Sequence, residues 1–423
     1  MSTPSGYRIA VVGCGVGGMA VATLLADAGH AVTVYERFAV PRPLGAGLLL
    51  QPTGLSVLRR LGVEPVALDC GARITGIDGR TTRGRTVLRL NYADLDPRLH
   101  GLGIHRGALF DLLFERLKRS AATLKTASEV ARIDASETQA VLHFANGTAP
   151  VAVDLALVAD GAHSALRMQA GIRHRAPLYP WGCLWTTLPD VEGRFAGQLH
   201  QRFRDSRVMI GALPVGRRPD DPQGPPCITV FWSLPAREIE AARAAGVAAL
   251  KARFLEHWPE LAAPLEHLRE VDQIAGATYR HVAMPRWSAG RVAFLGDAAH
   301  GTSPQLGQGA NLALLDAATL ASALATAPDI DTALSLAEAE RQPPAAFYRQ
   351  ASHLLTPFYQ SRFAPLGWLR DLTFGPLCAF PPSRNLMLST LAGVRRSWWR
   401  TFPLDAAGRP DLPLVNSASA ACI

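Results

Sequence analysis

Apolar and polar positions near the N-terminus alternate in a way that predicts two short strands around one helix. Residues 9–12 and 31–35 are mostly apolar and rich in valine, which is typical of buried strands. Residues 19–28 between them have the composition of an apolar helix, and the glycines at positions 13, 15, 17 and 18 separate this helix from the first strand. The segment is therefore predicted to fold as strand, glycine turn, helix and second strand, with Glu36 at the end of the second strand.

The same segment also has the composition of a membrane span. Residues 9–26 carry no charged side chain, and a stretch of that length approaches what crosses a bilayer. The glycine cluster lies inside this stretch and fits a turn better than a continuous helix. We therefore expect a soluble protein without an integral membrane span.

The composition is that of a globular protein with more than one structural unit. The chain has 423 residues, of which 48% are hydrophobic and 18% are charged, so at least one large core is expected. The formal net charge of +8 is spread along the chain without a run of basic residues, and nucleic acid is not an expected partner. The six cysteines show neither a Cys-x-x-Cys pair nor zinc-ligand spacing, which favours the cytoplasm and predicts no metal site.

Two later segments also read as buried strands that end in an acidic residue. Residues 155–160 and residues 291–297 are apolar runs, and each run ends in aspartate. After the second run, a turn through residues 302–310 precedes a helix that we expect to begin near Asn311.

The glycine turn has the layout of a dinucleotide-binding fingerprint. Glycines let the backbone approach a pyrophosphate, and the N–H groups at the start of the following helix face it. Glu36 follows Gly18 by 18 residues, where a carboxylate accepts hydrogen bonds from both ribose hydroxyls of an adenosine and repels a 2′-phosphate. FAD or NAD is therefore favoured over NADP at this site. Arg37 is expected either to cover the adenine or to be solvated.

Together and in this order, the three segments resemble the FAD-contacting stretches of the class A flavoprotein monooxygenases, the aromatic hydroxylases typified by para-hydroxybenzoate hydroxylase. The resemblance covers roughly residues 8–320, and the chain departs from it at Leu315-Asp316, where the family often has an acidic pair. It implies that Arg106, at a predicted helix start, reaches a cofactor phosphate or ribityl oxygen, and that Asp297 binds a ribityl hydroxyl. The residues expected at the FAD are Gly13, Gly15, Val16, Gly17, Gly18, Glu36, Arg37, Gly47, Arg106, Asp160, Asp297, Pro304, Gly307, Gly309, Ala310 and Asn311.

The resemblance implies an α/β fold: a Rossmann-type FAD-binding domain with an inserted β-sheet substrate domain, followed by C-terminal helices. The FAD-binding domain is assigned to residues 1–72, 100–176 and 273–350, the substrate domain to residues 73–99 and 177–272, and the C-terminal helical region and tail to residues 351–423. Aromatic residues between positions 353 and 380 are expected to pack on the substrate domain, form a dimer contact or touch a membrane surface. The protein is expected to be a monomer or a homodimer.

The resemblance also implies a reaction, the hydroxylation or epoxidation of a hydrophobic aromatic compound such as a specialised metabolite. In this family NADH or NADPH binds transiently, reduces FAD and leaves, and the reduced flavin reacts with O2 to give a C4a-hydroperoxide that transfers one oxygen atom. No second glycine fingerprint follows a strand here, which agrees with transient binding of the nicotinamide.

Other reactions remain open for such a flavoprotein. One alternative is an oxidoreductase without oxygen insertion, such as an oxidase, desaturase or reductase, and another is a flavoprotein without turnover of its own. A flavin-dependent halogenase would use a lysine and a Trp-x-Trp-x-Ile motif, whereas this chain has Trp181 and Trp185 four residues apart and no lysine before Lys118.

Candidates for substrate binding come from the segments between the cofactor motifs. Trp185 and Trp232 lie in aromatic strand-like runs and either line a substrate pocket or pack in a core. His200 is positioned either to deprotonate a phenol or to serve as an ordinary structural histidine. No residue is assigned as a catalytic nucleophile, because in this family the flavin carries the reactive oxygen.

Overall fold

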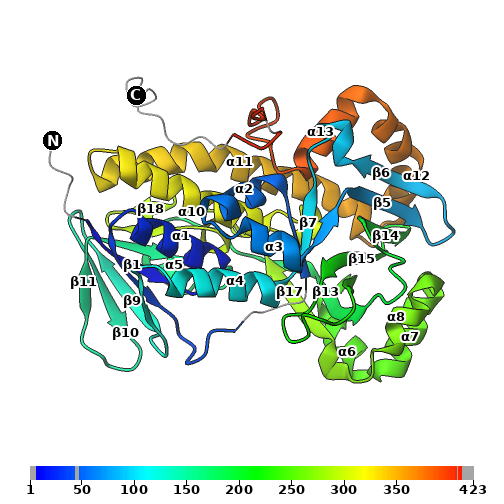
Figure 1. Cartoon of the computed structure of the whole chain (residues 1–423), viewed down its shortest axis with the longest axis horizontal. Helices are drawn as coiled ribbons and strands as arrows, with labels where there is room; N and C mark the ends of the chain where they lie inside the picture. Colours follow the sequence, from blue (N-terminus) through cyan, green and yellow to red (C-terminus); the bar gives the residue numbers. More distant parts are fainter. Residues whose placement is uncertain (1–5, 43–46, 407, 412–423) are drawn as a thin grey trace.

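The computed structural model describes residues 6–42, 47–406 and 408–411, and Figure 1 shows how their helices and strands are arranged. It has several sheets with helices around them and ends in a group of helices, so the predicted α/β fold is confirmed. The end of the expected C-terminal tail, from residue 412, lies outside the described residues.

A six-stranded sheet carries the glycine turn. Its strands lie in the order β18-β19-β12-β1-β2-β8. Their bounds are β1 (Arg8–Val12), β2 (Ala31–Tyr35), β8 (Thr123–Lys125), β12 (Leu155–Val158), β18 (Ser288–Ala289) and β19 (Val292–Phe294). β1 pairs in parallel with β2 and β12, and β12 pairs in parallel with β19, so the carboxyl ends of these strands lie at one edge of the sheet. The three predicted cofactor segments all leave the sheet at this edge.

Helices cover this sheet and pack with it in two apolar cores, of which the second contains α5 and α9. The helices are α1 (Val16–Asp27), α2 (Pro52–Arg60), α3 (Glu64–Cys70), α4 (Arg106–Lys118), α5 (Leu166–Gln169), α9 (Asp297–His300), α10 (Gly309–Thr326) and α11 (Ile330–Tyr359). The helix expected near Asn311 therefore begins two residues earlier. α10 is apolar and long enough to cross a membrane by length and composition, and 78% of it is buried inside the protein.

Two smaller sheets border these cores. The first holds β9 (Val130–Ala135), β10 (Ala140–Phe144) and β11 (Val151–Val153), and the second holds β3 (Gly47–Leu50), β4 (Ala72–Ile74) and β7 (Gly101–His105). β3 and β7 run antiparallel and bring the chain after Gly47 against the start of α4. This second sheet connects the two halves of the molecule.

A seven-stranded sheet forms the other half, with the order β17-β13-β16-β15-β14-β5-β6. Its strands are β5 (Gly76–Thr81), β6 (Thr86–Asn91), β13 (Leu178–Pro189), β14 (Gln198–Arg204), β15 (Val208–Gly216), β16 (Cys227–Pro235) and β17 (Ala275–Arg280). One face packs against α6 (Ile239–Ala244), α7 (Gly246–His257) and α8 (Ala262–Glu266). The opposite face contacts β3 and β7.

The chain ends in long helices. α11 is followed by α12 (Ala364–Ala379) and α13 (Pro381–Leu391), and short 3₁₀ turns lie at Tyr92–Asp94 (η1), Ala236–Glu238 (η2), Pro259–Leu261 (η3), Val271–Gln273 (η4) and Pro304–Leu306 (η5). α11 is continuous across residue 350, where the FAD-binding domain was expected to end. The buried residues of α11 contribute to several cores, and the division into domains stays a proposal.

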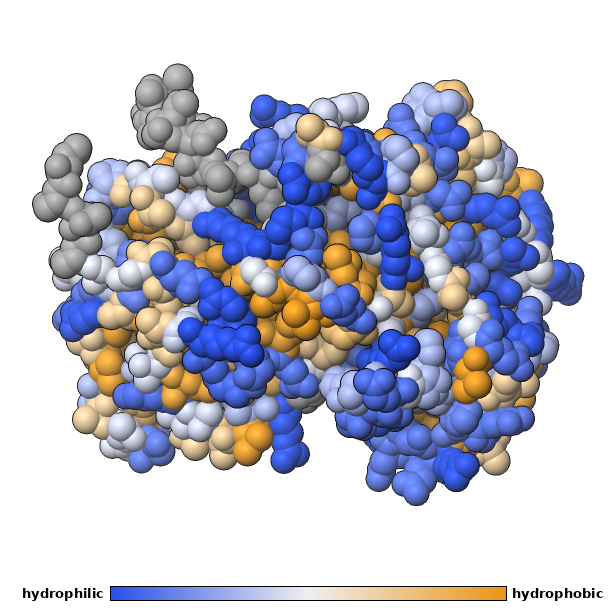
Figure 2. Space-filling model, viewed as in Figure 1, coloured by the Kyte–Doolittle hydropathy of each residue, from blue (hydrophilic) through white to orange (hydrophobic). Residues whose placement is uncertain are grey.

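The face of the molecule drawn in Figure 2 is mostly polar. Figure 2 shows one apolar area near its centre, where Figure 1 places α3 and α4. Val66 and Leu68 of α3 are exposed, and the other large apolar side chains of that helix pair are at least half-buried.

Candidate functional site

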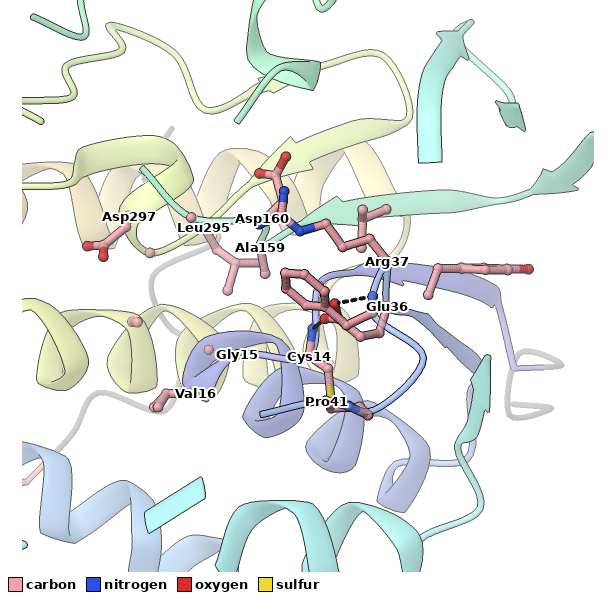
Figure 3. A pocket seen from close by; sticks show the side chains of 18 of the residues that line it. Cys14, Gly15, Val16, Glu36, Arg37, Pro41, Ala159, Asp160, Leu295 and Asp297 are labelled. Atoms are coloured by element: carbon pink, nitrogen blue, oxygen red, sulfur yellow. Dashed lines mark hydrogen bonds between the residues drawn. The ribbon is translucent and has the colours of Figure 1, made fainter. Parts of the chain in front are cut away.

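A cavity of about 330 Å³ lies at the edge where β1, β2, β12 and β19 end (Figure 3). The predicted cofactor residues that line it are Gly13, Gly15, Val16, Gly17, Glu36, Arg37, Arg106, Asp160, Asp297, Gly309 and Ala310. Those that lie outside its lining are Gly18, Gly47, Pro304, Gly307 and Asn311. The structure therefore brings together residues separated by almost three hundred positions in the sequence.

The four glycines of the turn serve different purposes. A Cβ atom on Gly18 would lie 2.1 Å from the carbonyl oxygen of Gly13, so glycine is required there for α1 to approach the turn. Gly13 has φ +104°, a backbone conformation that other residues rarely adopt. A Cβ atom on Gly17 would lie 3.2 Å from the side chain of Leu295 and 3.3 Å from that of Ala313 in α10, so Gly17 packs closely against both residues. Only at Gly15 would a Cβ meet no atom within 4 Å, so this glycine leaves open space in the cavity.

Two helices begin at this cavity without a side-chain cap. Gly15 is the N-cap residue of α1, and Gln308 is that of α10, and neither helix start receives a side-chain hydrogen bond. Uncapped N–H groups and the helix dipole favour negative charge at both positions. The two ends therefore fit the pyrophosphate of a dinucleotide and a ring system that gains negative charge on reduction.

The carboxylate of Glu36 is held in place by backbone groups. Its two oxygens accept hydrogen bonds from the N–H of Cys14 at 2.9 Å and the N–H of Phe38 at 3.0 Å, drawn in part in Figure 3. Each oxygen keeps one further acceptor position, as two ribose hydroxyls require. Arg37 stacks over the ring of Phe38, with 4.6 Å from Cζ to the ring centroid, and also lines the cavity.

Asp160 follows β12 and lines the same cavity as Glu36. Burial raises the pKa of its carboxyl to about 6, against the opposing effect of hydrogen bonds from Ser164 and its own backbone and of the positive charges of Arg167 and Arg37. Arg167 donates hydrogen bonds to the carbonyl oxygens of Ala298 and Ala162, so it ties the second cofactor segment to the third. Arg167 therefore fixes the local fold next to the cavity.

Asp297 begins α9 directly after Gly296, which has φ +59°. A Cβ atom on Gly309 would lie 3.7 Å from Oδ1 of Asp297, so this carboxylate stands beside the start of α10. No described side chain donates a hydrogen bond to the Asp297 carboxylate, which leaves its oxygens free to accept from a polyol.

Asn311 positions the start of α10 from outside the cavity. Its Oδ1 accepts from the N–H of Gln51 at 2.8 Å, and its Nδ2 donates to the carbonyl oxygens of Leu49 at 3.2 Å and Gly307 at 3.1 Å. The side chain is completely buried. Asn311 therefore ties the end of β3 to α10.

Asp316, where the chain departs from the family's acidic pair, contacts the side chains of Arg341 and His300. Asp316 accepts hydrogen bonds from Nε of Arg341 at 2.9 Å and from the N–H of Gly296 at 2.9 Å, and it contacts His300. Sequence reasoning did not assign His300 or Arg341 to the site. The signal for His300 is its place three residues after Asp297, but nothing in the sequence around Arg341 indicates this contact.

Trp232 and His200 lie on the sheet face that packs against the helices α6–α8. The Trp232 ring is 2% exposed and lies 5.1 Å from the ring of Phe254. His200 has its Nδ1 3.8 Å from Oδ2 of Asp78, and its ring lies 5.8 Å from Phe195, a member of the same core. Because this face is turned away from the cofactor cavity, both placements favour core packing over the predicted substrate contact.

Trp185 lies on the opposite face, which is turned toward the cofactor half. Its ring is 5.4 Å from the ring of Phe231. Thr229 of this face lies against Gly47, where a Cβ would come within 2.4 Å of its Oγ1, and Met209 lies 4.0 Å from Nε2 of Gln305 in η5. Phe231 and Thr229, which the sequence analysis did not single out, therefore share a face with Trp185.

The cavity with two uncapped helix starts, next to an aromatic sheet face, defines a flavoprotein with the fold of para-hydroxybenzoate hydroxylase. The chain belongs to the family described as "FAD binding domain", whose model matches residues 7–348. The family resemblance and the predicted FAD are thereby confirmed.

Similar proteins oxygenate aromatic compounds. The chain is 34% identical to the 3-amino-4-hydroxybenzoate 2-monooxygenase of Streptomyces cremeus, over 83% of this chain and 88% of that protein. It is 27% identical to the 2-heptyl-3-hydroxy-4(1H)-quinolone synthase of Mycobacteroides abscessus, over 91% of this chain and 97% of that protein. The structure of Klebsiella pneumoniae HpxO complexed with FAD and uric acid matches with a TM-score of 0.76 at 22% identity, over 92% and 97% of the two chains.

These relatives support oxygenation over the alternative flavin reactions. The chain is an FAD-dependent aromatic monooxygenase.

Proposed function

We propose that this monooxygenase oxygenates an uncharged, largely apolar aromatic compound that lies between the cofactor cavity and the aromatic sheet face, with NADH or NADPH as reductant. The cytoplasm is the proposed location. The two relatives differ in the polarity of the compound in their names, since one is named for an aminohydroxybenzoate and the other for a heptyl quinolone. The substrate of this chain must be inferred from its own residues.

The observation that carries this proposal is the absence of charge on the described sheet face toward the cofactor half. Side chains alternate between the two faces of a strand, so the members of this face can be listed. On the four strands β13, β15, β16 and β17 they are Trp181, Cys183, Trp185 and Thr187 in β13, Met209, Gly211, Leu213 and Val215 in β15, Thr229, Phe231 and Ser233 in β16, and Ala275, Ala277 and Tyr279 in β17. An aromatic carboxylate on this face would lose hydration without gaining a cationic partner from it, which costs several kcal/mol.

The centre of the face is flat and aromatic. A Cβ on Gly211 would lie 2.0 Å from the Phe231 ring, so the ring covers this glycine closely. Trp185 and Phe231 remain half-buried although they lie inside the molecule. Their rings offer stacking area for a planar substrate.

Arg106 is a described cationic side chain near this sheet face, so its charge bears on whether the substrate is charged. It is close enough to Tyr279 to affect that residue electrostatically. Arg106 also lines the cofactor cavity, where the family resemblance gives it a partner on FAD. We therefore assign its charge to the cofactor and not to the substrate.

Tyr279 places a buried hydroxyl group on this face, next to the side chain of Trp185. Its hydroxyl oxygen is buried, and burial raises the pKa of the phenol well above its ordinary value. The hydroxyl therefore keeps its proton and is available to donate a hydrogen bond to a substrate oxygen. Such a contact would orient a phenol, quinolone or similar ring.

FAD supplies the redox chemistry with O2 when it is bound. Glu36 and Asp297 would hold the ribose and ribityl parts, and the uncapped start of α10 favours negative charge beside Gly309. The aromatic sheet face excludes water from the substrate and fixes its plane. No side chain of this chain has to form a covalent bond to the substrate.

The proposal is tested with matched pairs of aromatic compounds that differ only in a carboxylate. Each compound is incubated with the FAD-loaded protein, NADH or NADPH and ¹⁸O₂, while nicotinamide oxidation and product mass are followed. We expect the uncharged member of a pair to accelerate nicotinamide oxidation and to acquire one labelled oxygen atom. Labelled products from carboxylates alone would overturn the substrate class, and accelerated oxidation without label in any product would overturn oxygen insertion.

A further inference from the structure

Helix α12 presents a second apolar face that no described part of the protein covers. Between positions 363 and 380 six large apolar side chains are exposed. They are Phe363 (60%), Trp368 (66%), Leu369 (47%), Leu372 (62%), Leu377 (40%) and Phe380 (60%). Trp368 and Leu372 are four positions apart, and Leu369 lies beside them, so they share one side of the helix. The apolar area at α3 in Figure 2 has only two exposed side chains, Val66 and Leu68, which makes α12 the more apolar surface.

The opposite side of α12 is anchored firmly in the protein. Arg370 is fully buried, and its guanidinium lies 4.5 Å above the ring of Phe203 and 5.1 Å above the ring of Tyr359. Its charge is paired with Asp371, the neighbouring residue. Phe374 also packs into this core. The exposed side of α12 is therefore fixed by the fold and carries no charge of its own.

A cluster of arginines lies beside this helix. Strand β6, the edge strand of the seven-stranded sheet, packs along α12, and Figure 1 shows β5, β6 and α12 together at one end of the molecule. Residues 76–91, which form this hairpin, include four arginines and one carboxylate, Asp78. Arg80 and Arg89 pair with Asp78, while Arg83 and Arg85 are exposed and form no ion pair with any described residue.

We propose that α12 and the β5–β6 hairpin form a docking surface for an anionic lipid bilayer. Exposed Trp, Phe and Leu side chains insert at the boundary between headgroups and acyl chains, and nearby arginines are attracted to anionic headgroups. A second copy of the chain fits less well, because a two-fold interface through this surface would bring both unpaired arginine pairs into one contact. The bilayer provides negative charge that matches them. Since α12 is covered on its other side, the protein lies on the bilayer and does not span it.

The test uses the full FAD-loaded protein and vesicles of phosphatidylcholine with or without phosphatidylglycerol. We expect sedimentation with the vesicles that contain phosphatidylglycerol, weak sedimentation with phosphatidylcholine alone, and partial release by salt. Trp368→Ser combined with Leu372→Ser should lower the partition coefficient by on the order of tenfold or more. Arg83→Ser and Arg85→Ser should each lower it about fivefold on the anionic vesicles.

Matched controls distinguish vesicle binding through α12 from nonspecific adsorption of the protein to vesicles. Trp399→Ser changes an even more exposed tryptophan outside α12, and Arg119→Ser changes an exposed arginine at the end of α4, so neither should alter binding. Retention of FAD shows that each variant is folded. The proposal fails if the protein does not bind the anionic vesicles, or if the controls reduce binding as much as the α12 variants. It also fails if the protein forms a dimer that Trp368→Ser with Leu372→Ser dissociates while vesicle binding is absent.

Discussion

Nε2 of His300 lies 2.5 Å from Oδ2 of Asp316, and both side chains are almost completely buried. Burial alone would raise the pKa of the Asp316 carboxyl, but the charges of His300 and Arg341 and hydrogen bonds from His300 and Gly296 lower it to about 2. The contact joins α9, α10 and α11 directly behind the turn that carries Asp297. It therefore holds a cofactor-binding segment from the side away from the cavity.

Asp316→Asn should destabilise the protein by about 3–5 kcal/mol, because it leaves the buried guanidinium of Arg341 without its counter-charge. Urea unfolding of the apoprotein measures this loss. Asp331→Asn is the matched control, since Asp331 pairs with Arg291 on the surface and should change stability little. Because the folded pKa of Asp316 is depressed, its contribution is present above about pH 4 and is lost as the pH falls toward 2. Equal losses in the two variants would contradict this account.

The ionised carboxylate of Asp160 should destabilise the folded protein, whereas that of Asp316 stabilises it. The folded pKa of Asp160, about 6, lies above the ordinary value, so its favourable contribution is full below about pH 4 and is lost as the pH rises through 6. Asp160→Asn should therefore stabilise the apoprotein modestly at pH 7.5, because solvent screens part of the effect of the raised pKa. The gain should shrink as the pH falls toward 5, as thermal unfolding across this pH range will show. A gain that is independent of pH would refute the raised pKa.

Gly15→Ala should weaken FAD binding without lowering the stability of the fold. The added methyl group meets no protein atom within 4 Å and extends into the cavity, so apoprotein stability should stay nearly unchanged while FAD affinity falls by tenfold or more. Gly18→Ala is the informative comparison, since its methyl group would clash with the backbone of Gly13 and should lower stability as well. Flavin fluorescence titration and urea unfolding of both variants provide the two readouts. Normal FAD affinity in Gly15→Ala would place the cofactor elsewhere.

Glu36→Ala and Asp297→Ala should each weaken FAD binding by roughly tenfold to a hundredfold, because each removes charged acceptors for cofactor hydroxyls. In Glu36→Ala the N–H groups of Cys14 and Phe38 also lose their partner. Equilibrium titration with FAD measures the effect, and Glu137→Ala, at an exposed position, serves as the control. Unchanged affinity in folded variants would contradict the assigned contacts.

The cofactor half was predictable from sequence because β1, β12 and β19 are short apolar runs that lead to Gly or Asp, and β2 is an apolar run that ends at Glu36. The orientation of the aromatic strands was not predictable from sequence. β13 and β16 are buried on both faces, so the alternation of side chains cannot show which face meets the cofactor. Trp185 and Trp232 consequently looked equivalent. α11 also departs from local rules, because Pro343 and Pro344 normally interrupt a helix, whereas here the buried side of α11 packs against α10.

The two tryptophans can now be told apart by experiment. Trp185→Ala removes half of the aromatic pair on the face toward the cofactor, so it should raise KM for an uncharged aromatic substrate and increase nicotinamide oxidation without product. Its stability should fall less than that of Trp232→Ala, which empties a fully packed site against Phe254 and should cost about 3–5 kcal/mol. Trp232→Ala protein that remains folded should keep the wild-type ratio of product to nicotinamide consumed. Coupling lost in Trp232→Ala and kept in Trp185→Ala would reverse the assignment of the two sheet faces.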